Sequence, residues 1–226
     1  MIELLRNIVS IPSYSKEEGA VADFLCNYLQ GQGLTFKRFK NNIILNKSSK
    51  DKKSGGVLLN SHIDTVKPAG GYTFDPHNPP ISDEKVYGLG SNDAGGCVVS
   101  LIETFKYFQN VELPFDLGLI LSAEEECSGA DGLVSLGEYI KENFDMAIIG
   151  EPTSLCGAIA ERGLLVIDGC AKGVTGHAAR NEGVNAIEIA LEDLTKIRNF
   201  KFGKVSPTMG EIKLSITQIN AGTQHN

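Results

Sequence analysis

The chain has 226 residues, of which 42% are hydrophobic and 22% are charged, the balance of a globular protein with one good core or one core and a small second unit. The net charge of −7 and the lack of a long Lys/Arg cluster exclude a typical nucleic-acid-binding protein. No run approaches the ~20 apolar residues that a membrane span needs, so no membrane partner is expected.

Cysteine usage indicates a reducing compartment. The five cysteines are odd in number and form no Cys-x-x-Cys pair, which argues against a disulfide framework and against a cysteine zinc site. The first residues, Met1 to Arg6, lack the apolar core of a signal peptide. We therefore expect a cytoplasmic protein with small, buried cysteines.

The first elements lead to a histidine. Apolar spacing predicts a helix over 2–9, and Ser15 with Glu18 resembles a capping box that opens a second helix, which Gly31 and Gly33 end. Strands are expected within 34–46, followed by a polar loop over 47–56.

An apolar run at 57–59 then begins a buried strand that delivers His62 and Asp64. Residues two apart on a strand project to the same side, so this pair is expected to serve one target, with the carboxylate orienting the imidazole.

Three more acidic motifs follow predicted elements. An irregular segment over 67–92 ends in a glycine-rich run, 88–96, which places Asp93 near the start of a helix over 97–108. Buried strands at 116–122 and 146–149, separated by a helix over about 132–143, run into Glu124–Glu126 and Glu151 respectively.

Alternating strands and helices predict an α/β fold, a mainly parallel sheet flanked by helices. In such sheets ligands bind outside the carboxyl ends of the strands, where His62, Asp64 and the acidic residues would converge.

The pattern changes near Gly157. A strand over 164–170, an amphipathic helix over 186–197 and an alternating strand over 212–219 form an incomplete strand–helix–strand unit. We therefore expect two domains: residues 1–160, which bind metal, and residues 161–226, the beginning of a second domain.

One histidine and three carboxylates suit a divalent metal, zinc first, then cobalt or manganese. The candidate ligands are His62, Asp93, Glu126 and Glu151. A shared carboxylate can hold two metals ~3.5–4 Å apart, and the metal lowers the pKa of water to roughly 7. Glu125, next to a ligand, is placed to take the proton of that water and pass it to a leaving amine.

Each signal alone has a simpler reading. His-x-Asp is usually structural, a triple Glu is usually a solvated helix face, and Gly-Glu-Pro can be only a turn. Gly88-Leu89-Gly90 is no dinucleotide fingerprint, because the third glycine is missing, and no Gly-x-Ser-x-Gly elbow occurs. The order and placement of the motifs together favour the metal site.

These motifs resemble a known family, the dinuclear zinc peptidases and deacylases that include acetylornithine deacetylase, succinyl-diaminopimelate desuccinylase and carboxypeptidases. The similarity covers essentially the whole chain and is greatest to acetylornithine deacetylase. The matching segments, in family order, are 61–66, 88–96, 122–126, 149–153 and 173–180.

The resemblance implies a role for each site residue. His62, Asp93 and Glu151 would hold one metal, and Asp93 and Glu126 the second. Asp64 would orient His62, and Glu125 would be general base and then acid. A cis peptide bond is implied at Asp93-Ala94.

His177, in what resembles a lid domain over 161–226, would polarise the scissile carbonyl. The family also implies a homodimer formed through the lid.

The implied reaction is removal of an acyl group from an N-acyl amino acid, as in arginine biosynthesis. The alternatives are a related desuccinylase or a di- or carboxypeptidase acting on a short peptide. Family members continue well beyond the equivalent of residue 226, so the return to the catalytic domain and a further metal-binding histidine are expected to be absent, and His225 is not expected to replace it. A third alternative is therefore an inactive fragment that only binds metal or a partner.

Overall fold

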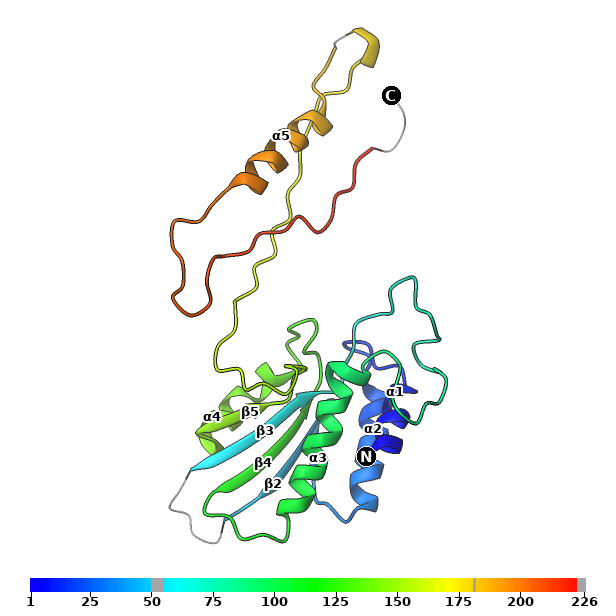
Figure 1. Cartoon of the computed structure of the whole chain (residues 1–226), viewed down its shortest axis with the longest axis vertical. Helices are drawn as coiled ribbons and strands as arrows, with labels where there is room; N and C mark the ends of the chain where they lie inside the picture. The colour runs from blue at the N-terminus through cyan, green and yellow to red at the C-terminus, as the bar shows by residue number, and fades with distance from the viewer. Residues whose placement is uncertain (50–54, 181, 223–226) are drawn as a thin grey trace. The chain divides into compact units, whose positions relative to one another are not determined.

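The computed structural model describes residues 1–49, 55–180 and 182–222. The chain forms two compact units, Met1–Leu155 and Cys156–Asn226, and the first contains the sheet (Figure 1). The polar loop predicted over 47–56 lies partly outside the described residues, and His225 lies outside them altogether.

The first unit is built on a five-stranded sheet with the order β1-β2-β4-β3-β5. β3 runs parallel to both β4 and β5, whereas β1 pairs with β2, and β2 with β4, in antiparallel fashion. The predicted α/β class is confirmed, and the sheet is mixed because the two strands on one side are antiparallel. The bounds are Lys37–Phe39 (β1), Asn42–Lys47 (β2), Gly56–His62 (β3), Asp116–Ser122 (β4) and Met146–Ile149 (β5).

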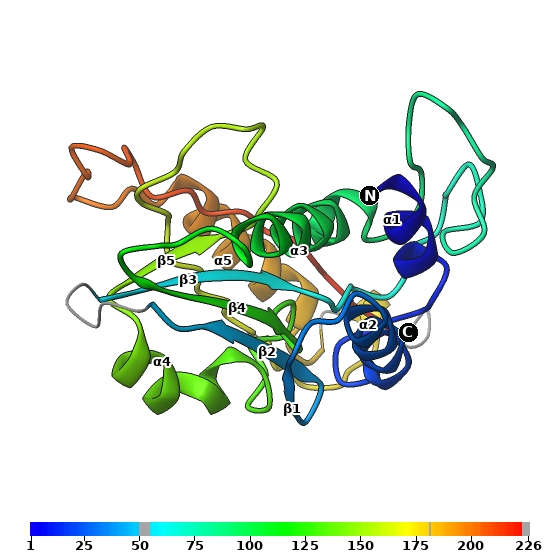
Figure 2. The same ribbon diagram turned by 90° about the horizontal axis from the view of Figure 1, so that it is seen from below.

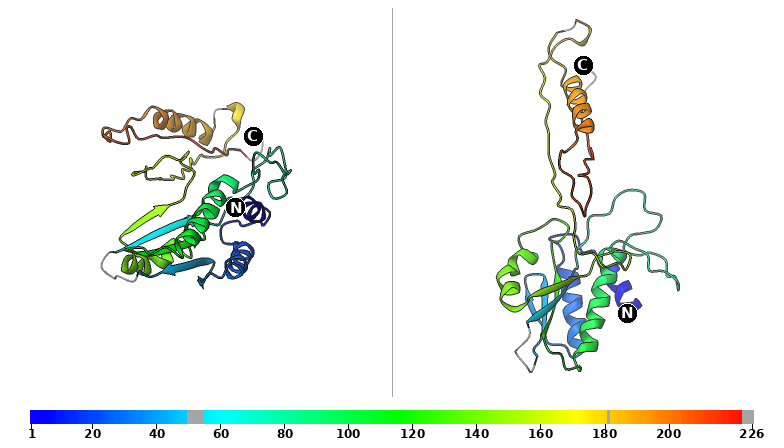
Figure 3. Two further views of the ribbon diagram at one scale, coloured as in Figure 1. Left: turned by 60° about the horizontal axis from the view of Figure 1, so that its bottom comes forward. Right: turned by 60° about the vertical axis from the view of Figure 1, so that its left-hand side comes forward.

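Alternating side chains of the central strands enter two cores, because successive residues of a strand face opposite sides of the sheet. Leu59 and Leu119 pack with the helices α1 (Ile2–Val9), α2 (Gly19–Gly31) and α3 (Gly96–Phe108). Leu58 and Ile120 instead pack with the turn η2 (Leu133–Leu136) and, through partly buried side chains, with α4 (Gly137–Asn143). Figures 2 and 3 show α3 and α4 on opposite faces of the sheet.

The start of the second helix differs from the sequence prediction. α2 begins at Gly19, and its cap residue Glu18 makes no side-chain capping bond, so Ser15 and Glu18 do not form a capping box. Both side chains instead bond to residues far along the chain. The Ser15 hydroxyl donates to Asp64, and the Glu18 carboxylate accepts the backbone N–H of Glu124.

Two other predictions for the first unit need correction. The helix predicted over 132–143 is divided at Leu136, whose backbone leaves the helical region (φ −106°, ψ 8°) while its side chain enters the smaller core. β5 was expected to be a buried strand, but all four of its residues are exposed. An apolar run predicts a strand without revealing whether its position is central or at an edge, and β5 is the last strand of the sheet.

The second unit contains one confirmed helix, α5 (Ala186–Asn199), whose N-terminus is capped by the Asn185 side chain bonding to the backbone N–H of Ile187. The strands predicted over 164–170 and 212–219 are wrong, since both segments lack strand structure and their apolar side chains are exposed. Alternation indicates which side chains could face a core, but a strand also needs a partner chain to share its hydrogen bonds. Across the described ranges, every helix is too short or too polar to traverse a lipid bilayer.

Candidate metal centre

Three parallel strands bring their carboxyl ends to one edge of the sheet. His62, the last residue of β3, lies opposite Ser122, the last residue of β4, and Asn60 of β3 lies opposite Ile149, the last residue of β5. The acidic residues that follow β4 and β5 therefore emerge beside His62.

His62, Asp93 and Glu151 form a cluster of possible metal ligands. Each offers one ligand atom, and these atoms all lie within 4.8 Å of one another. The Nε2 atom of His62 lies 3.0 Å from Oδ1 of Asp93 and 3.8 Å from Oε1 of Glu151. The His62 side chain is 1% exposed, whereas those of Asp93 and Glu151 are 55% and 34% exposed, so the cluster opens to solvent on its acidic side. One imidazole and two carboxylates at these distances fit a divalent cation such as zinc.

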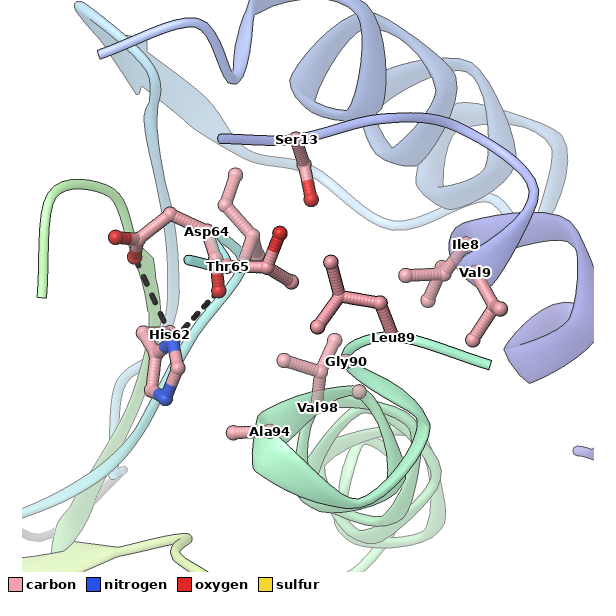
Figure 4. Close-up of a pocket in the computed structure, with 12 residues that line it drawn as sticks. Ile8, Val9, Ser13, His62, Asp64, Thr65, Leu89, Gly90, Ala94 and Val98 are labelled. Carbon is pink, nitrogen blue, oxygen red and sulfur yellow. Dashed lines mark hydrogen bonds and ion pairs between the residues drawn. The ribbon is translucent and has the colours of Figure 1, made fainter. Parts of the chain in front are cut away.

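The second ring nitrogen of His62 is held from behind. Nδ1 lies 2.9 Å from the backbone oxygen of Asp64 and 3.5 Å from its Oδ1, as the dashed lines in Figure 4 show. A carbonyl oxygen only accepts, so Nδ1 carries a proton and donates it. In the neutral tautomer, Nε2 then presents its lone pair to the acidic side, the orientation that a metal ligand requires.

The carboxylates around His62 favour its protonated form in the metal-free chain. Burial lowers the pKa of the imidazole, but the hydrogen bonds to Asp64 and Asp93 and the negative charges of Glu151 and Asp64 outweigh it and raise the pKa to about 9. A proton on Nε2 occupies the position that a cation would take. Proton and metal therefore compete for this nitrogen.

Glu151 of the cluster and Glu126 near it resist ionisation. Burial raises the pKa of Glu151 and of Glu126, and the negative charge of Asp93 adds to the effect in both, although His62 opposes it. Carboxylates that crowd together without a counter-charge behave in this way, and a bound dication would relieve the repulsion.

Asp64 connects the end of β3, where it contacts His62, to the turn that follows β4. Its carboxylate lies on the Nδ1 side of His62 and accepts the Ser15 hydroxyl at 2.7 Å and the backbone N–H groups of Glu125 and Glu126 at 3.0 and 3.1 Å. Burial raises the pKa of this carboxyl, but the hydrogen bonds from His62, Ser15 and the two backbone groups prevail and lower it. Asp64 therefore stays ionised and faces away from the metal-binding side. Asp64 lies beyond β3 rather than on it, so the idea that both side chains face one target is wrong.

Asp93 is presented by the turn η1 (Ser91–Gly95), immediately before α3. The peptide bond between Asp93 and Ala94 is cis, as predicted. Gly90 adopts φ +77°, and a Cβ atom there would lie 2.6 Å from Cγ2 of Thr65. The turn therefore requires glycine at this position, and its backbone is closed by a bond from the N–H of Gly95 to the oxygen of Gly90.

The remaining expected site residues occupy different positions. Oε2 of Glu125 lies 4.0 Å from Nε2 of His62, at the margin of the cluster. Glu126 follows it in the same turn and is not one of the three residues whose ligand atoms gather. His177 belongs to the second unit, where it is exposed and its Nδ1 accepts the backbone N–H of Ala179 at 3.2 Å.

Two supporting residues escaped the sequence reading. The Ser15 hydroxyl bonds to Asp64, and the Ser61 hydroxyl donates at 2.8 Å to the backbone oxygen of Gly150, the residue before Glu151. The sequence signal for Ser61 is its position next to His62 on β3, the strand that lies between β4 and β5. For Ser15 the only available pattern was Ser-x-x-Glu, which equally describes a helix cap.

A small cavity lies behind His62 and Asp64, between α1, α3 and the end of β3 (Figure 4). Its volume is about 10 Å³, room for one water molecule and far too little for a substrate. The buried Thr65 hydroxyl, which has no hydrogen-bond partner among the described residues, is part of its wall. The cluster itself is open to solvent on the side of Asp93 and Glu151.

Comparison with known proteins gives a consistent result. The model of peptidase family M20/M25/M40 matches residues 58–217. An acetylornithine deacetylase of Proteus mirabilis is 32% identical over 220 residues, which are 88% of this chain and 55% of the relative. The chain thus spans about half the length of the curated relatives it matches.

Solved structures share the fold. A tripeptidase of Staphylococcus aureus superposes with a TM-score of 0.59 at 19% identity, covering 87% of this chain and 55% of that one. A Bacillus subtilis protein described as a dinuclear metal binding peptidase gives a TM-score of 0.52 at 17% identity, covering 66% of this chain and 41% of that one.

Proposed function

The chain belongs to peptidase family M20/M25/M40, and from this we propose that it carries the metal-binding part of a hydrolase that cleaves linear amide bonds. The observation that carries the proposal is the cluster of His62, Asp93 and Glu151 at the carboxyl edge of the parallel strands. The donor set of a hydrolytic zinc site is a buried imidazole, here oriented by the bond from its Nδ1, together with two accessible carboxylates.

We propose that two divalent cations bind, with zinc as the first choice and cobalt or manganese as alternatives. His62, Asp93 and Glu151 would hold one, and Asp93 and Glu126 the other. The effect of Asp93 on the pKa of Glu126 supports their proximity, and the Bacillus subtilis neighbour is described as dinuclear. Cations at this position would supply Lewis-acid polarisation of the substrate carbonyl and a lowered pKa for water.

The proton transfers would fall to Glu125. Its carboxylate lies at the margin of the cluster, 4.0 Å from His62, and is exposed enough to meet both water and substrate. It would take a proton from the attacking water and return it to the leaving amine, as one carboxylate can do in sequence. Asp64 would keep the imidazole oriented, and His177 of the second unit would polarise the scissile carbonyl.

The substrate we propose is an N-acyl amino acid, because the relatives with 32% identity are acetylornithine deacetylases. A desuccinylase or a di- or carboxypeptidase is the alternative, since the solved neighbours include a tripeptidase. Because the chain spans about half of its relatives, a non-catalytic fragment that binds metal or a partner is a further alternative.

We also propose a division into a metal-binding domain over 1–160 and the first part of a lid domain over 161–226. Exposed apolar side chains on α5, among them Ile187 and Leu191, support a homodimer formed through the lid. The five cysteines are all free thiols, which supports a cytoplasmic location.

The test is turnover of N-acetylornithine and other N-acyl amino acids, beside dipeptides, by the zinc-loaded chain and its Glu125→Gln variant. We expect the variant to retain bound zinc and to lose roughly 10²- to 10⁴-fold in rate, the usual contribution of a general base. Activity that survives the substitution refutes the role of Glu125. Zinc binding without turnover of any substrate by the wild-type chain favours the non-catalytic alternative.

A further inference from the structure

Glu18 is a buried carboxylate that the hydrolytic roles above do not use. Its side chain is 0% exposed and lies just before α2. Three groups donate to it: the backbone N–H of Lys16 at 2.6 Å, the Asn41 side-chain amide at 3.0 Å and the backbone N–H of Glu124 at 3.2 Å. A carboxylate is rarely buried so fully unless such partners satisfy it.

The bond to Glu124 reaches the acidic turn that follows β4. Glu124 adopts φ +56°, a conformation unusual for a residue with a side chain, and its own carboxylate turns inward to accept the backbone N–H of Asp131 at 3.2 Å. Gly129 closes the turn with a bond to the Glu124 oxygen, and a Cβ atom at Gly129 would overlap the Glu124 side chain. Glu124 is therefore a structural residue, although it stands beside two residues of the site.

Two buried carboxylates thus hold three consecutive backbone N–H groups. Glu18 accepts from Glu124, and Asp64 accepts from Glu125 and Glu126. Ser15, from the same short segment as Glu18, donates to Asp64. The segment that resembles a capping box in the sequence is therefore connected to both ends of this three-residue stretch.

We propose that Glu18 is a positioning residue for the acidic turn, acting through Glu124 to set the direction in which Glu125 and Glu126 leave the backbone. The inference rests on the proposed metal-binding role of this edge of the sheet. Removing the Glu18 carboxylate leaves the buried N–H group of Glu124, a residue of positive φ, without its acceptor. The turn then relaxes, and the directions of the Glu125 and Glu126 side chains change.

Glutamine is the informative substitution at this position. Its amide oxygen can accept both backbone N–H groups that Oε1 accepts now. The Asn41 amide can rotate to present its oxygen to the new NH₂ group, giving up only the exposed bond that this oxygen accepts from Arg38. Glu18→Gln therefore keeps the turn in place, whereas Glu18→Ala releases it. Glu18→Asp retains the charge but withdraws the carboxylate by one methylene group.

The experiment is a cobalt titration of the whole chain, followed by visible absorption, for the wild type, Glu18→Ala, Glu18→Gln and Leu29→Ala. Leu29 lies near the C-terminal end of α2, the end away from Glu18, and is fully buried in the larger core, so it controls for lost stability. Melting temperatures of the metal-free proteins are measured in parallel.

We expect Glu18→Ala to weaken cobalt binding at least tenfold and to change the absorption spectrum, while Glu18→Gln stays within about threefold of the wild type. Leu29→Ala should lower the melting temperature as much as Glu18→Ala does but change the cobalt affinity less than twofold. If Glu18→Ala does not fold, Glu18→Asp takes its place with the same expected loss.

Equal cobalt affinity in Glu18→Ala (or Glu18→Asp) and Leu29→Ala overturns the inference while leaving the metal site intact. Cobalt binding by Glu18→Gln as weak as that by Glu18→Ala overturns the inference as well. If the wild type binds no cobalt, the proposed function fails, and the positioning role fails with it.

Discussion

The raised pKa of His62 predicts that metal binding depends steeply on pH. In the metal-free chain His62 has a pKa of about 9, so it is protonated at pH 7 and must lose that proton before Nε2 can bind a cation. Relative to the dissociation constant for the neutral imidazole, the apparent constant is about 100 times larger at pH 7 and about 2 times larger at pH 9. It should therefore fall roughly 50-fold across this range.

The same linkage acts on stability, with the opposite sign. A pKa raised from 6.5 to about 9 stabilises the folded, metal-free chain by roughly 3 kcal/mol below pH 6.5, and this stabilisation disappears as the pH rises through 9. The raised pKa values of Glu126 and Glu151 act in the same direction, because the folded chain loses stability as a buried carboxyl group ionises. Metal-free protein should therefore weaken on the alkaline side, and metal-loaded protein should not.

Calorimetric titration with zinc in chelator-buffered solutions at pH 7, 8 and 9 tests the dependence of affinity on pH, and urea unfolding of the metal-free and zinc-loaded proteins at the same pH values tests the dependence of stability. Repeating each titration in two buffers of different ionisation enthalpy counts the protons released, and we expect about one from His62 at pH 7. In Asp64→Asn the chief group that raises the pKa is neutral, so the dependence on pH should flatten. His77→Gln, a histidine outside the cluster, should leave it unchanged. An affinity that does not vary between pH 7 and 9 would refute the competition between proton and metal.

Three further predictions concern the framework around the site. Asp64→Ala leaves two partly buried backbone N–H groups without their carboxylate acceptor and should lower the free energy of unfolding by about 2–4 kcal/mol, measured in urea. Gly129→Ala places a Cβ atom 2.6 Å from that of Glu124, so zinc affinity should fall, and wild-type affinity would contradict the described turn. Leu119→Ala, in the larger core, should cost about 2–5 kcal/mol in urea while the folded protein keeps its zinc affinity, because Leu119 lies away from the strand ends.

The candidate cluster could be predicted because its position depends on general rules. Apolar runs identified β3 and β5, and the rule that ligands bind at the carboxyl ends of parallel strands placed His62 and Glu151 together. Asp93 was harder to place by such rules, because it belongs to an irregular turn. The family resemblance supplied both its role and the cis bond that follows it.

The roles of Ser15 and Glu18 could not be predicted in this way. Ser-x-x-Glu before an apolar helix satisfies the local rule for a capping box, but in the structure each side chain has a partner far along the chain, Asp64 for Ser15 and Glu124 for Glu18. Local preferences are weak compared with the cost of leaving buried groups unpaired. The local pattern therefore fails at the segment that supports the site.

The strands predicted in the second unit show a different limit. Alternation of apolar and polar residues over 212–219 records which side chains would share a face, but it carries no information about pairing. The same holds for β5, whose apolar residues form a strand but remain exposed. Both strand pairing and strand burial depend on partners that are distant in sequence, and the periodicity of one segment carries no information about those partners.

The central claim is that His62 and its two acidic neighbours bind a divalent metal. The most direct measurement is bound metal per chain, determined by elemental analysis after zinc loading and desalting, for the wild type and for His62→Ala. We predict at least one equivalent in the wild type and its loss in the variant, because Nε2 of His62 is the one nitrogen among the three ligand atoms of the cluster. Zinc retained equally by both proteins, or by neither, would contradict the account.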